Sequence, residues 1–286
     1  MAKITEKKEK FFGHEFKKSL GQNFISDTNL LKSLVNDSCI TSEDVCLEIG
    51  AGAGTLTKQL SLVAKKVVSV EIDKSLSPIL DEIEKSNPNL KIVYNDILKL
   101  SEDEIVNLFG EGKDVRFKVV ANIPYYITSP ILFKFLKMPN VTSLSLLMQK
   151  EVAERIVAKK SDSDYGALSV MVNYLSEPVI TRIVGRNNFY PVPNVDSAFL
   201  KATKKEDITR LEAQEIERLV KAAFSCRRKM LTNNLSGEYN LSKPEIAEIL
   251  EKTNLKPTAR AEELTVKDYV QLNKELAKYK STKPAK

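Results

Sequence analysis

The sequence Asn-Ile-Pro-Tyr at positions 122–125 could present an amino group for chemistry. It follows an apolar run that is typical of a buried strand, so it falls where the strand ends. The Asn122 side-chain oxygen and the backbone carbonyl of Ile123 or Pro124 could accept the hydrogens of an aromatic amine and direct its lone pair at an electrophile. Pro124 stiffens the turn, and the Tyr125 ring could stack on a flipped base. An ordinary strand exit with a structural tyrosine is the alternative.

A glycine-rich loop, G-A-G-A-G at positions 50–54, follows the apolar run 45–49, and a helical pattern restarts at Thr55. Gly50 and Gly52 permit the tight turn and close backbone approach that a bulky ligand requires. The spacing is G-x-G-x-G and not the pyrophosphate fingerprint G-x-G-x-x-G. The loop therefore predicts a nucleotide-like cofactor of another kind, with a purely structural turn as the alternative.

Two further strand patterns end in carboxylates that could bind such a cofactor. The run 67–71 ends at Glu71, and the run 91–96 ends at Asp96. Because parallel strands end at the same edge of a sheet, Glu71 would reach ribose hydroxyls and Asp96 an adenine amine. Together with the Asn-Ile-Pro-Tyr turn, these residues predict an enzyme that moves a methyl group from S-adenosylmethionine to a planar, amine-bearing base. Positioning supplies much of the rate of such a displacement, and no strong general base is needed.

Three other segments give the chain a resemblance to a known family. They are K-S-L-G-Q-N-F-I at 18–25, N-F-Y-P-V-P-N-V-D-S at 188–197 and the F-x-x-R-R-K pattern at 224–229. With the motifs above, they resemble the S-adenosylmethionine-dependent ribosomal RNA adenine dimethyltransferases, and most of all the small-subunit, kasugamycin-sensitivity branch. The resemblance runs from about Phe16 to about Leu276.

The resemblance implies a role for each matching residue. Phe189 would form an aromatic clamp with Tyr125 around an extruded adenine, and stacking of a base on an aromatic ring is worth about 1–3 kcal/mol. Without the resemblance, Phe189 is more typical of a core residue. The predicted catalytic residues are Asn122, Ile123, Pro124, Tyr125 and Phe189. The predicted contacts of S-adenosylmethionine are Gln22, Asn23, Ile25, Gly50, Gly52, Glu71, Ile72, Asp96, Ile97 and Asn122.

The chain differs from some relatives near the proposed chemistry. Ile123 stands where Leu is frequent, and Tyr126 follows the motif where Asn is common. Side-chain identity is tolerant at these positions, so the predicted activity is unchanged. Tyr126 could alter how the base enters.

Length and pattern predict a soluble enzyme of two parts. At 286 residues the chain exceeds the size at which one core stops growing. Strand and helix patterns alternate from about Val45 to about Leu200, which predicts a Rossmann-like, doubly wound α/β sheet of the class I methyltransferase kind. We predict a catalytic, S-adenosylmethionine-binding domain over 1–205, with a flexible basic head over 1–15, and a small all-helical domain for RNA recognition over 206–286. Helices of the second domain are predicted at 211–224, 228–235, 243–251 and 262–276.

Composition excludes several classes of protein. No apolar stretch approaches the roughly twenty residues of a membrane span, and the lysine-rich start lacks the apolar region of a signal peptide, so a cytoplasmic protein is expected. The three cysteines are unpatterned and His14 is the only histidine, which argues against disulfides, a metal site and a Ser-His-Asp triad. The formal charge of +6 suits a polyanionic partner. Arg227, Arg228 and Lys229 are the predicted RNA contacts, unless they stabilise the domain junction. A monomer is expected.

The predicted reaction is dimethylation of N6 on two adjacent adenosines in a 3′-terminal hairpin of small-subunit (16S) rRNA, on an immature 30S particle. Large-subunit (23S) adenine methyltransferases that confer macrolide resistance share the catalytic motifs, but the closing segment 259–272 is more similar to the small-subunit enzymes. An adenine-N6 DNA methyltransferase is a weaker alternative, because its motif reads D-P-P-Y or N-P-P-Y. A non-catalytic ribosome-assembly or RNA-binding factor is the alternative from another class.

Overall fold

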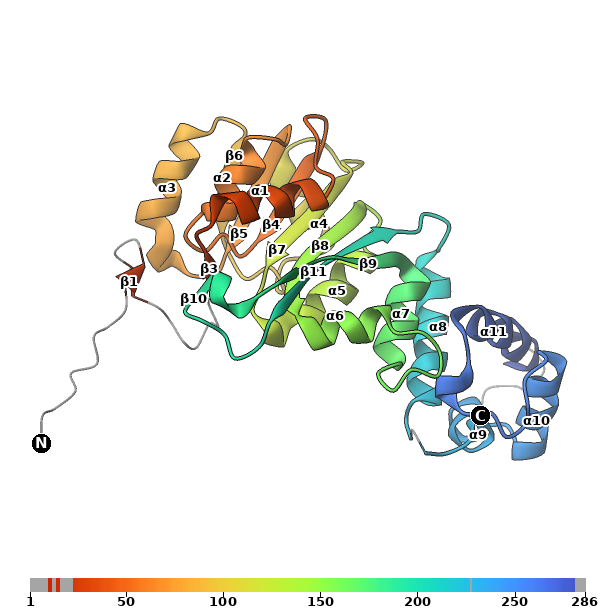
Figure 1. The fold of residues 1–286 in the computed structure, drawn as a ribbon. Helices are drawn as coiled ribbons and strands as arrows, with labels where there is room; N and C mark the ends of the chain where they lie inside the picture. The colour runs from red at the N-terminus through yellow and green to blue at the C-terminus, as the bar shows by residue number, and fades with distance from the viewer. Residues whose placement is uncertain (1–9, 12–13, 16–22, 227, 281–286) are drawn as a thin grey trace, which may run out of the picture. The chain divides into compact units, whose positions relative to one another are not determined.

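The computed structural model (Figure 1) describes four stretches of the chain. Two predicted site residues, Gln22 and Arg227, lie outside these stretches, as does most of the predicted basic head. The described stretches are 10–11, 14–15, 23–226 and 228–280.

The contacts within the chain divide it into two compact units. The first comprises Met1–Ala153 with Val179–Thr203, and the second comprises Glu154–Pro178 with Lys204–Lys286. Residues 154–178 therefore group with the C-terminal helices, although the sequence placed them in the first domain. The assignment of catalysis to one domain and RNA recognition to the other stays a prediction.

A seven-stranded mixed sheet is the frame of the first unit, in the order β6-β5-β4-β7-β8-β11-β9. The pairs β6–β5, β5–β4, β4–β7 and β7–β8 are parallel, and β11 runs antiparallel to β8. The predicted Rossmann-like α/β fold is confirmed. The strands are β4 (Val45–Ile49), β5 (Lys66–Glu71), β6 (Leu90–Tyr94), β7 (Phe117–Asn122), β8 (Val141–Gln149), β9 (Ser176–Val184) and β11 (Ser197–Lys204).

Helices cover both faces of this sheet, which explains why its central strands are mostly apolar and buried. Every residue of β4 is buried, as expected for a parallel strand between two helical layers. Val120 of β7 packs in one core with side chains of α1, α2 and α3, and these three helices lie on one face of the sheet (Figure 1). Phe117 lies on the opposite face because strand side chains alternate, and there its ring is 4.8 Å from that of Phe109 in α4. The helices of the first unit are α1 (Thr28–Asp37), α2 (Thr55–Ser61), α3 (Ser77–Ser86), α4 (Glu102–Phe109) and α5 (Thr128–Lys137). Helix α6 (Lys150–Val157) begins in the first unit and ends in the second.

The direction in which the chain adds strands to the sheet reverses between β4 and β7. From β4 the chain adds β5 and then β6 on one side, and it later adds β7 and then β8 on the other. Ligands of open α/β sheets bind beyond the carboxyl ends of the strands at such a point of reversal. The glycine loop follows β4, and Asn122 is the last residue of β7. The topology therefore brings these two motifs to the same crevice.

Short strand pairs complete this part of the chain. β3 (Phe24–Ile25) pairs antiparallel with β10 (Phe189–Tyr190), with Ile25 opposite Phe189. Two segments of the family resemblance that lie far apart in the sequence are thus held side by side. A separate pair is formed by β1 (Lys10–Phe11) and β2 (His14–Glu15).

The second unit carries the helices of the C-terminal region, and two predicted helix starts were wrong. The helix predicted from Arg228 begins at Leu231, because Met230 has an extended backbone conformation. The helix predicted from Glu262 begins at Val266, because Thr265 and Asp268 cap it by exchanging hydrogen bonds. The helices are α7 (Ala167–Leu175), α8 (Arg210–Ala223), α9 (Leu231–Tyr239), α10 (Lys243–Lys252) and α11 (Val266–Lys280). No helix in the described part of the chain is long and apolar enough to cross a membrane.

Replacement of Gly54 by alanine is expected to destabilise the first unit strongly. Gly54 caps α2 with φ of +74°, and an added Cβ would overlap the buried side chain of Ile83 in α3. We expect a loss of about 2–4 kcal/mol in the free energy of unfolding, from backbone strain together with overpacking. Gly110 has φ of +64° but open space around it, so Gly110→Ala should lose only about 1–2 kcal/mol. Denaturant unfolding measures both, and equal losses would contradict the packing of α3 on the loop.

Candidate functional site

A cavity of about 260 Å³ opens in the first unit beyond the carboxyl ends of the central strands. All the predicted catalytic and cofactor residues in the described part of the chain line it. They are Asn23, Ile25, Gly50, Gly52, Glu71, Ile72, Asp96, Ile97, Asn122, Ile123, Pro124, Tyr125 and Phe189. Their roles stay predictions, but the fold brings them to one place.

The glycine loop presents bare backbone to this cavity. The Gly50 amide donates to the carbonyl of Val70 at 2.8 Å, which fastens the start of the loop to β5. Gly52 has φ of +56°, and a Cβ there would lie 2.7 Å from the Phe24 ring. No role was predicted for Phe24, although it sits between two predicted contact residues. Its ring closes over Gly52, so both the backbone conformation and the space require glycine at this position.

Glu71 is the most firmly held charged group of the cavity lining. Its side chain is 3% exposed. Its Oε2 accepts from the Gly52 amide and its Oε1 from the Asp73 amide, both at 2.8 Å. Burial raises the pKa of Glu71, and these backbone hydrogen bonds oppose the shift. Each carboxylate oxygen retains a lone pair, so the group can still accept from a ligand hydroxyl.

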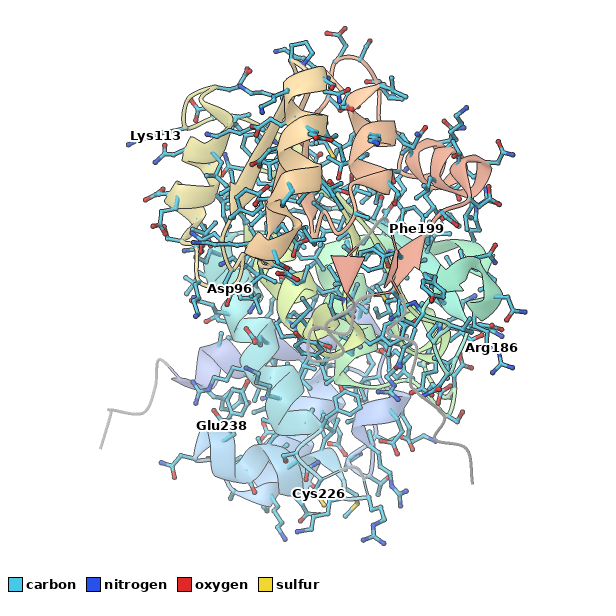
Figure 2. The ribbon with its side chains drawn as sticks, turned by 90° about the vertical axis from the view of Figure 1, so that its left-hand side faces the viewer. Asp96, Lys113, Arg186, Phe199, Cys226 and Glu238 are labelled. Atoms are coloured by element: carbon cyan, nitrogen blue, oxygen red, sulfur yellow. The ribbon has the colours of Figure 1, made fainter. Side chains whose placement is uncertain are left out.

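Asp96, labelled in Figure 2, follows the carboxyl end of β6 and lines the same cavity as Glu71. The strand ends at Tyr94 and not at Asp96 as predicted, because the chain turns there. The Asp96 Oδ1 accepts from the amide of Leu98 at 3.0 Å, and Oδ2 lies 3.9 Å from Nζ of Lys99. The carboxylate therefore stabilises its own turn and keeps acceptor capacity toward the cavity.

The Asn122 amide has a defined orientation. Its Nδ2 donates to the backbone carbonyl of Asn23 at 2.9 Å. A carbonyl oxygen can only accept, so the amide nitrogen must face Asn23 and Oδ1 must face away from it. Within the described residues Oδ1 has no hydrogen-bond partner. The site thus keeps one oriented acceptor at the end of β7.

Two aromatic residues that line the cavity are held in place by neighbouring elements of the fold. The Tyr125 hydroxyl lies 3.0 Å from Oγ of Ser197, a buried residue at the start of β11. Phe189 is buried in β10, and β10 is held by its pairing with β3. Both rings line the cavity. Ser197 had no predicted role, although it belongs to the segment 188–197 that carried the family resemblance.

A buried polar cluster lies behind the glycine loop. Glu48, in the middle of β4, is fully buried, and its Oε2 accepts from Ser69 Oγ at 2.6 Å. The hydroxyl of Thr57, which is also buried, lies close to the same carboxyl. Burial raises the pKa of Glu48 to about 7, and the charge of Glu71 adds to the shift. The sequence signal was a single carboxyl within an otherwise apolar strand, to which no role had been given.

The predicted RNA contacts lie in the second unit. Arg228 and Lys229 are exposed, in a turn between α8 and α9. The third predicted RNA contact, Arg227, is outside the described residues. The prediction that these three residues bind RNA therefore stays a prediction. Among the side chains that the structure describes, no group of three or more His, Cys, Asp or Glu could hold a metal ion.

Comparisons with known proteins decide the family. A family model described as ribosomal RNA adenine dimethylase matches residues 13–278. The ribosomal RNA small subunit methyltransferase A of Bacillus cereus is 43% identical over 277 residues, covering 94% of this chain and 94% of that protein. The chain belongs to the ribosomal RNA adenine dimethylase family.

Solved structures agree with this membership. A dimethyladenosine transferase from Plasmodium falciparum is similar with a TM-score of 0.76 and 27% identity, over 89% of this chain and 98% of that one. The 23S rRNA methyltransferase ErmE is similar with a TM-score of 0.67 and 26% identity, over 89% and 99%. The family resemblance predicted from the sequence is confirmed. As a member of this family the chain is an rRNA adenine dimethyltransferase, with S-adenosylmethionine as its methyl donor.

The Glu48→Gln variant is expected to change how the stability of this dimethylase depends on pH. The pKa of Glu48 is about 7 in the folded chain, against about 4.3 when unfolded. Between these values the folded state keeps a proton that the unfolded state has released. The free energy of unfolding therefore falls as pH rises through this window. From about pH 5 to pH 8 the unmodified protein should lose on the order of 1–3 kcal/mol relative to Glu48→Gln.

Denaturant unfolding at several pH values measures this difference. Glu43→Gln is the matched control, because Glu43 is exposed in the same unit. It should follow the pH profile of the unmodified protein. If Glu48→Gln follows that profile too, Glu48 does not titrate in the core.

Proposed function

We propose that this chain transfers two methyl groups from S-adenosylmethionine to N6 of each of two adjacent adenosines in a 3′-terminal hairpin of small-subunit rRNA. The observation that carries the proposal is the Asn122 amide, whose nitrogen is held by Asn23 so that its oxygen is free to accept. The name of the Bacillus cereus relative supports the choice of the small subunit.

The cofactor fits the side of the cavity formed by β4, β5 and β6. Gly50 and Gly52 offer bare backbone, and the Glu71 carboxylate is positioned to accept from ribose hydroxyls. Asp96 would accept from the adenine amine, with Ile72 and Ile97 as the apolar contacts. When bound, S-adenosylmethionine supplies an electrophilic methyl group on a sulfonium. The residues of the chain bind it, orient it and exclude water from it.

The target adenine would enter on the β7 side, between Tyr125 and Phe189. Asn122 Oδ1 would accept one hydrogen of the N6 amine, and a backbone carbonyl of the turn the other. Either Ile123 or Pro124 could supply that carbonyl, because the Pro124 carbonyl, which accepts from the Ile127 amide at 3.2 Å, keeps a second lone pair. These acceptors draw the nitrogen lone pair out of the ring plane and toward the methyl group. Positioning of this kind can account for several orders of magnitude in rate.

The large-subunit alternative is less well supported. The relative with 43% identity is named for the small subunit. The TM-score is 0.76 with the dimethyladenosine transferase and 0.67 with ErmE. We extend the proposal to an immature 30S particle as the natural substrate and to action as a monomer in the cytoplasm, with a part in small-subunit biogenesis.

Removal of the oriented acceptor should sharply reduce methyl transfer. Asn122→Ala is expected to lower the rate by about 100-fold or more. Asn122→Asp should also fail, because a carboxylate would face the Asn23 carbonyl with no hydrogen to donate. Asn36→Ala is the control, since Asn36 is exposed on α1 and away from the cavity.

The assay uses labelled S-adenosylmethionine with unmethylated small-subunit particles or with large-subunit rRNA, followed by nucleoside analysis. The expected product is N6,N6-dimethyladenosine in small-subunit RNA alone. Label only in large-subunit RNA would move the assignment to that enzyme. No label in either RNA, with S-adenosylmethionine still bound, would favour a binding factor.

A further inference from the structure

Most of the large apolar side chains that line the cavity are buried, but three are exposed. Ile72 is 55% exposed, Leu98 is 36% exposed and Tyr126 is 67% exposed. Side chains that line a cavity and still face solvent must lie at its mouth. Ile72 and Leu98 follow β5 and β6, on the side of Glu71 and Asp96. Tyr126 follows β7, on the side of the Asn-Ile-Pro-Tyr turn.

Tyr126 is exposed on a hydrogen-bonded turn of the backbone. It is the middle residue of a 3₁₀ turn, Tyr125–Ile127, which leads directly into α5. The turn is closed by the hydrogen bond from the Ile127 amide to the Pro124 carbonyl. The two neighbouring tyrosines therefore differ: Tyr125 is fastened to Ser197, whereas the Tyr126 hydroxyl has no hydrogen-bond partner in the part of the chain that the structure describes. An exposed tyrosine ring at the mouth of a cavity is typical of a binding contact.

We propose that Tyr126 is the stacking platform for the base next to the target adenosine. The proposal rests on the proposed function and deepens it. A base that enters the cavity stays joined through its ribose and phosphate to its neighbours, so a neighbouring base must lie at the mouth. An aromatic ring offers such a base a face without reading its sequence. Of two adjacent adenosines, one occupies the cavity while the other lies on Tyr126, close to the entrance it uses next.

The position of the Tyr126 ring along the sheet indicates which ligand it contacts. Glu71, Asp96, Ile72 and Leu98 belong to the cofactor side of the cavity. Tyr126 is on the opposite side, one residue from the ring expected to stack on the target base. Nucleic acid is the ligand that reaches this side, and an unpaired base in an RNA loop is the group that stacks on tyrosine.

A double-mutant cycle between protein and RNA tests the contact. One partner is Tyr126→Ala, and the other is a synthetic 3′ hairpin of small-subunit rRNA in which the neighbouring adenosine is replaced by an abasic ribose. In the unmodified protein the abasic change should weaken hairpin binding by about tenfold. Tyr126→Ala should weaken binding of the intact hairpin by a similar factor. The abasic change should then cost the variant nearly nothing, because both changes remove the same contact.

Conservative variants separate stacking from a structural role. Tyr126→Phe should behave like the unmodified protein, since the hydroxyl has no partner, while Tyr126→Leu should behave like Tyr126→Ala. Leu62→Ala is the control, because Leu62 is also exposed but does not line the cavity. An equal abasic penalty in the unmodified protein and in Tyr126→Ala would overturn the assignment of Tyr126. If the unmodified protein fails to methylate the intact hairpin and small-subunit particles, the proposed function itself fails, and the two results are thereby distinguished.

Discussion

The hydrogen bond from Asn122 Nδ2 to the Asn23 carbonyl is the interaction on which the site depends. It joins the end of β7 to the segment that enters β3, and β3 in turn pairs with β10. One bond therefore sets the direction of the Asn122 amide and ties it to the strand that carries Phe189. The cofactor and the target base would both lie against these elements. A shift of this contact would therefore displace the groups that bind both ligands.

The sheet topology determines where this contact forms. The residues around it include some that are unfavourable for the stability of the fold. The point of reversal between β4 and β7 leaves a crevice at the carboxyl ends of the strands. Gly50 and Gly52 adopt left-handed backbone where they line it, and the carboxyl group of Glu48 is fully buried behind it. Such departures from the usual rules are expected where a chain is shaped for a ligand and not for stability alone.

Hydrophobic periodicity and strand order account for what the sequence could predict. The run 45–49 is a strand as predicted, and Glu71 and Asn122 end their strands. A hydrophobicity pattern cannot distinguish two neighbouring tyrosines. It could not show that the Tyr125 hydroxyl contacts Ser197 while Tyr126 is exposed. The direction of the Asn122 amide could not be predicted from the sequence either, because it is fixed by the Asn23 carbonyl, which is remote in sequence. Helix starts in the second unit depended on single backbone angles and caps, to which periodicity is blind.

The most direct test of the central claim is a crystal structure of the protein with S-adenosylhomocysteine and an adenosine-bearing hairpin of small-subunit rRNA. S-adenosylhomocysteine stands for the cofactor after methyl transfer. We expect one extruded adenine between Tyr125 and Phe189, with its N6 at hydrogen-bonding distance, about 2.7–3.2 Å, from Asn122 Oδ1. The Asn122 nitrogen should still donate to the Asn23 carbonyl. An adenine bound outside the cavity, or an Asn122 amide turned so that its nitrogen faces N6, would contradict the central claim.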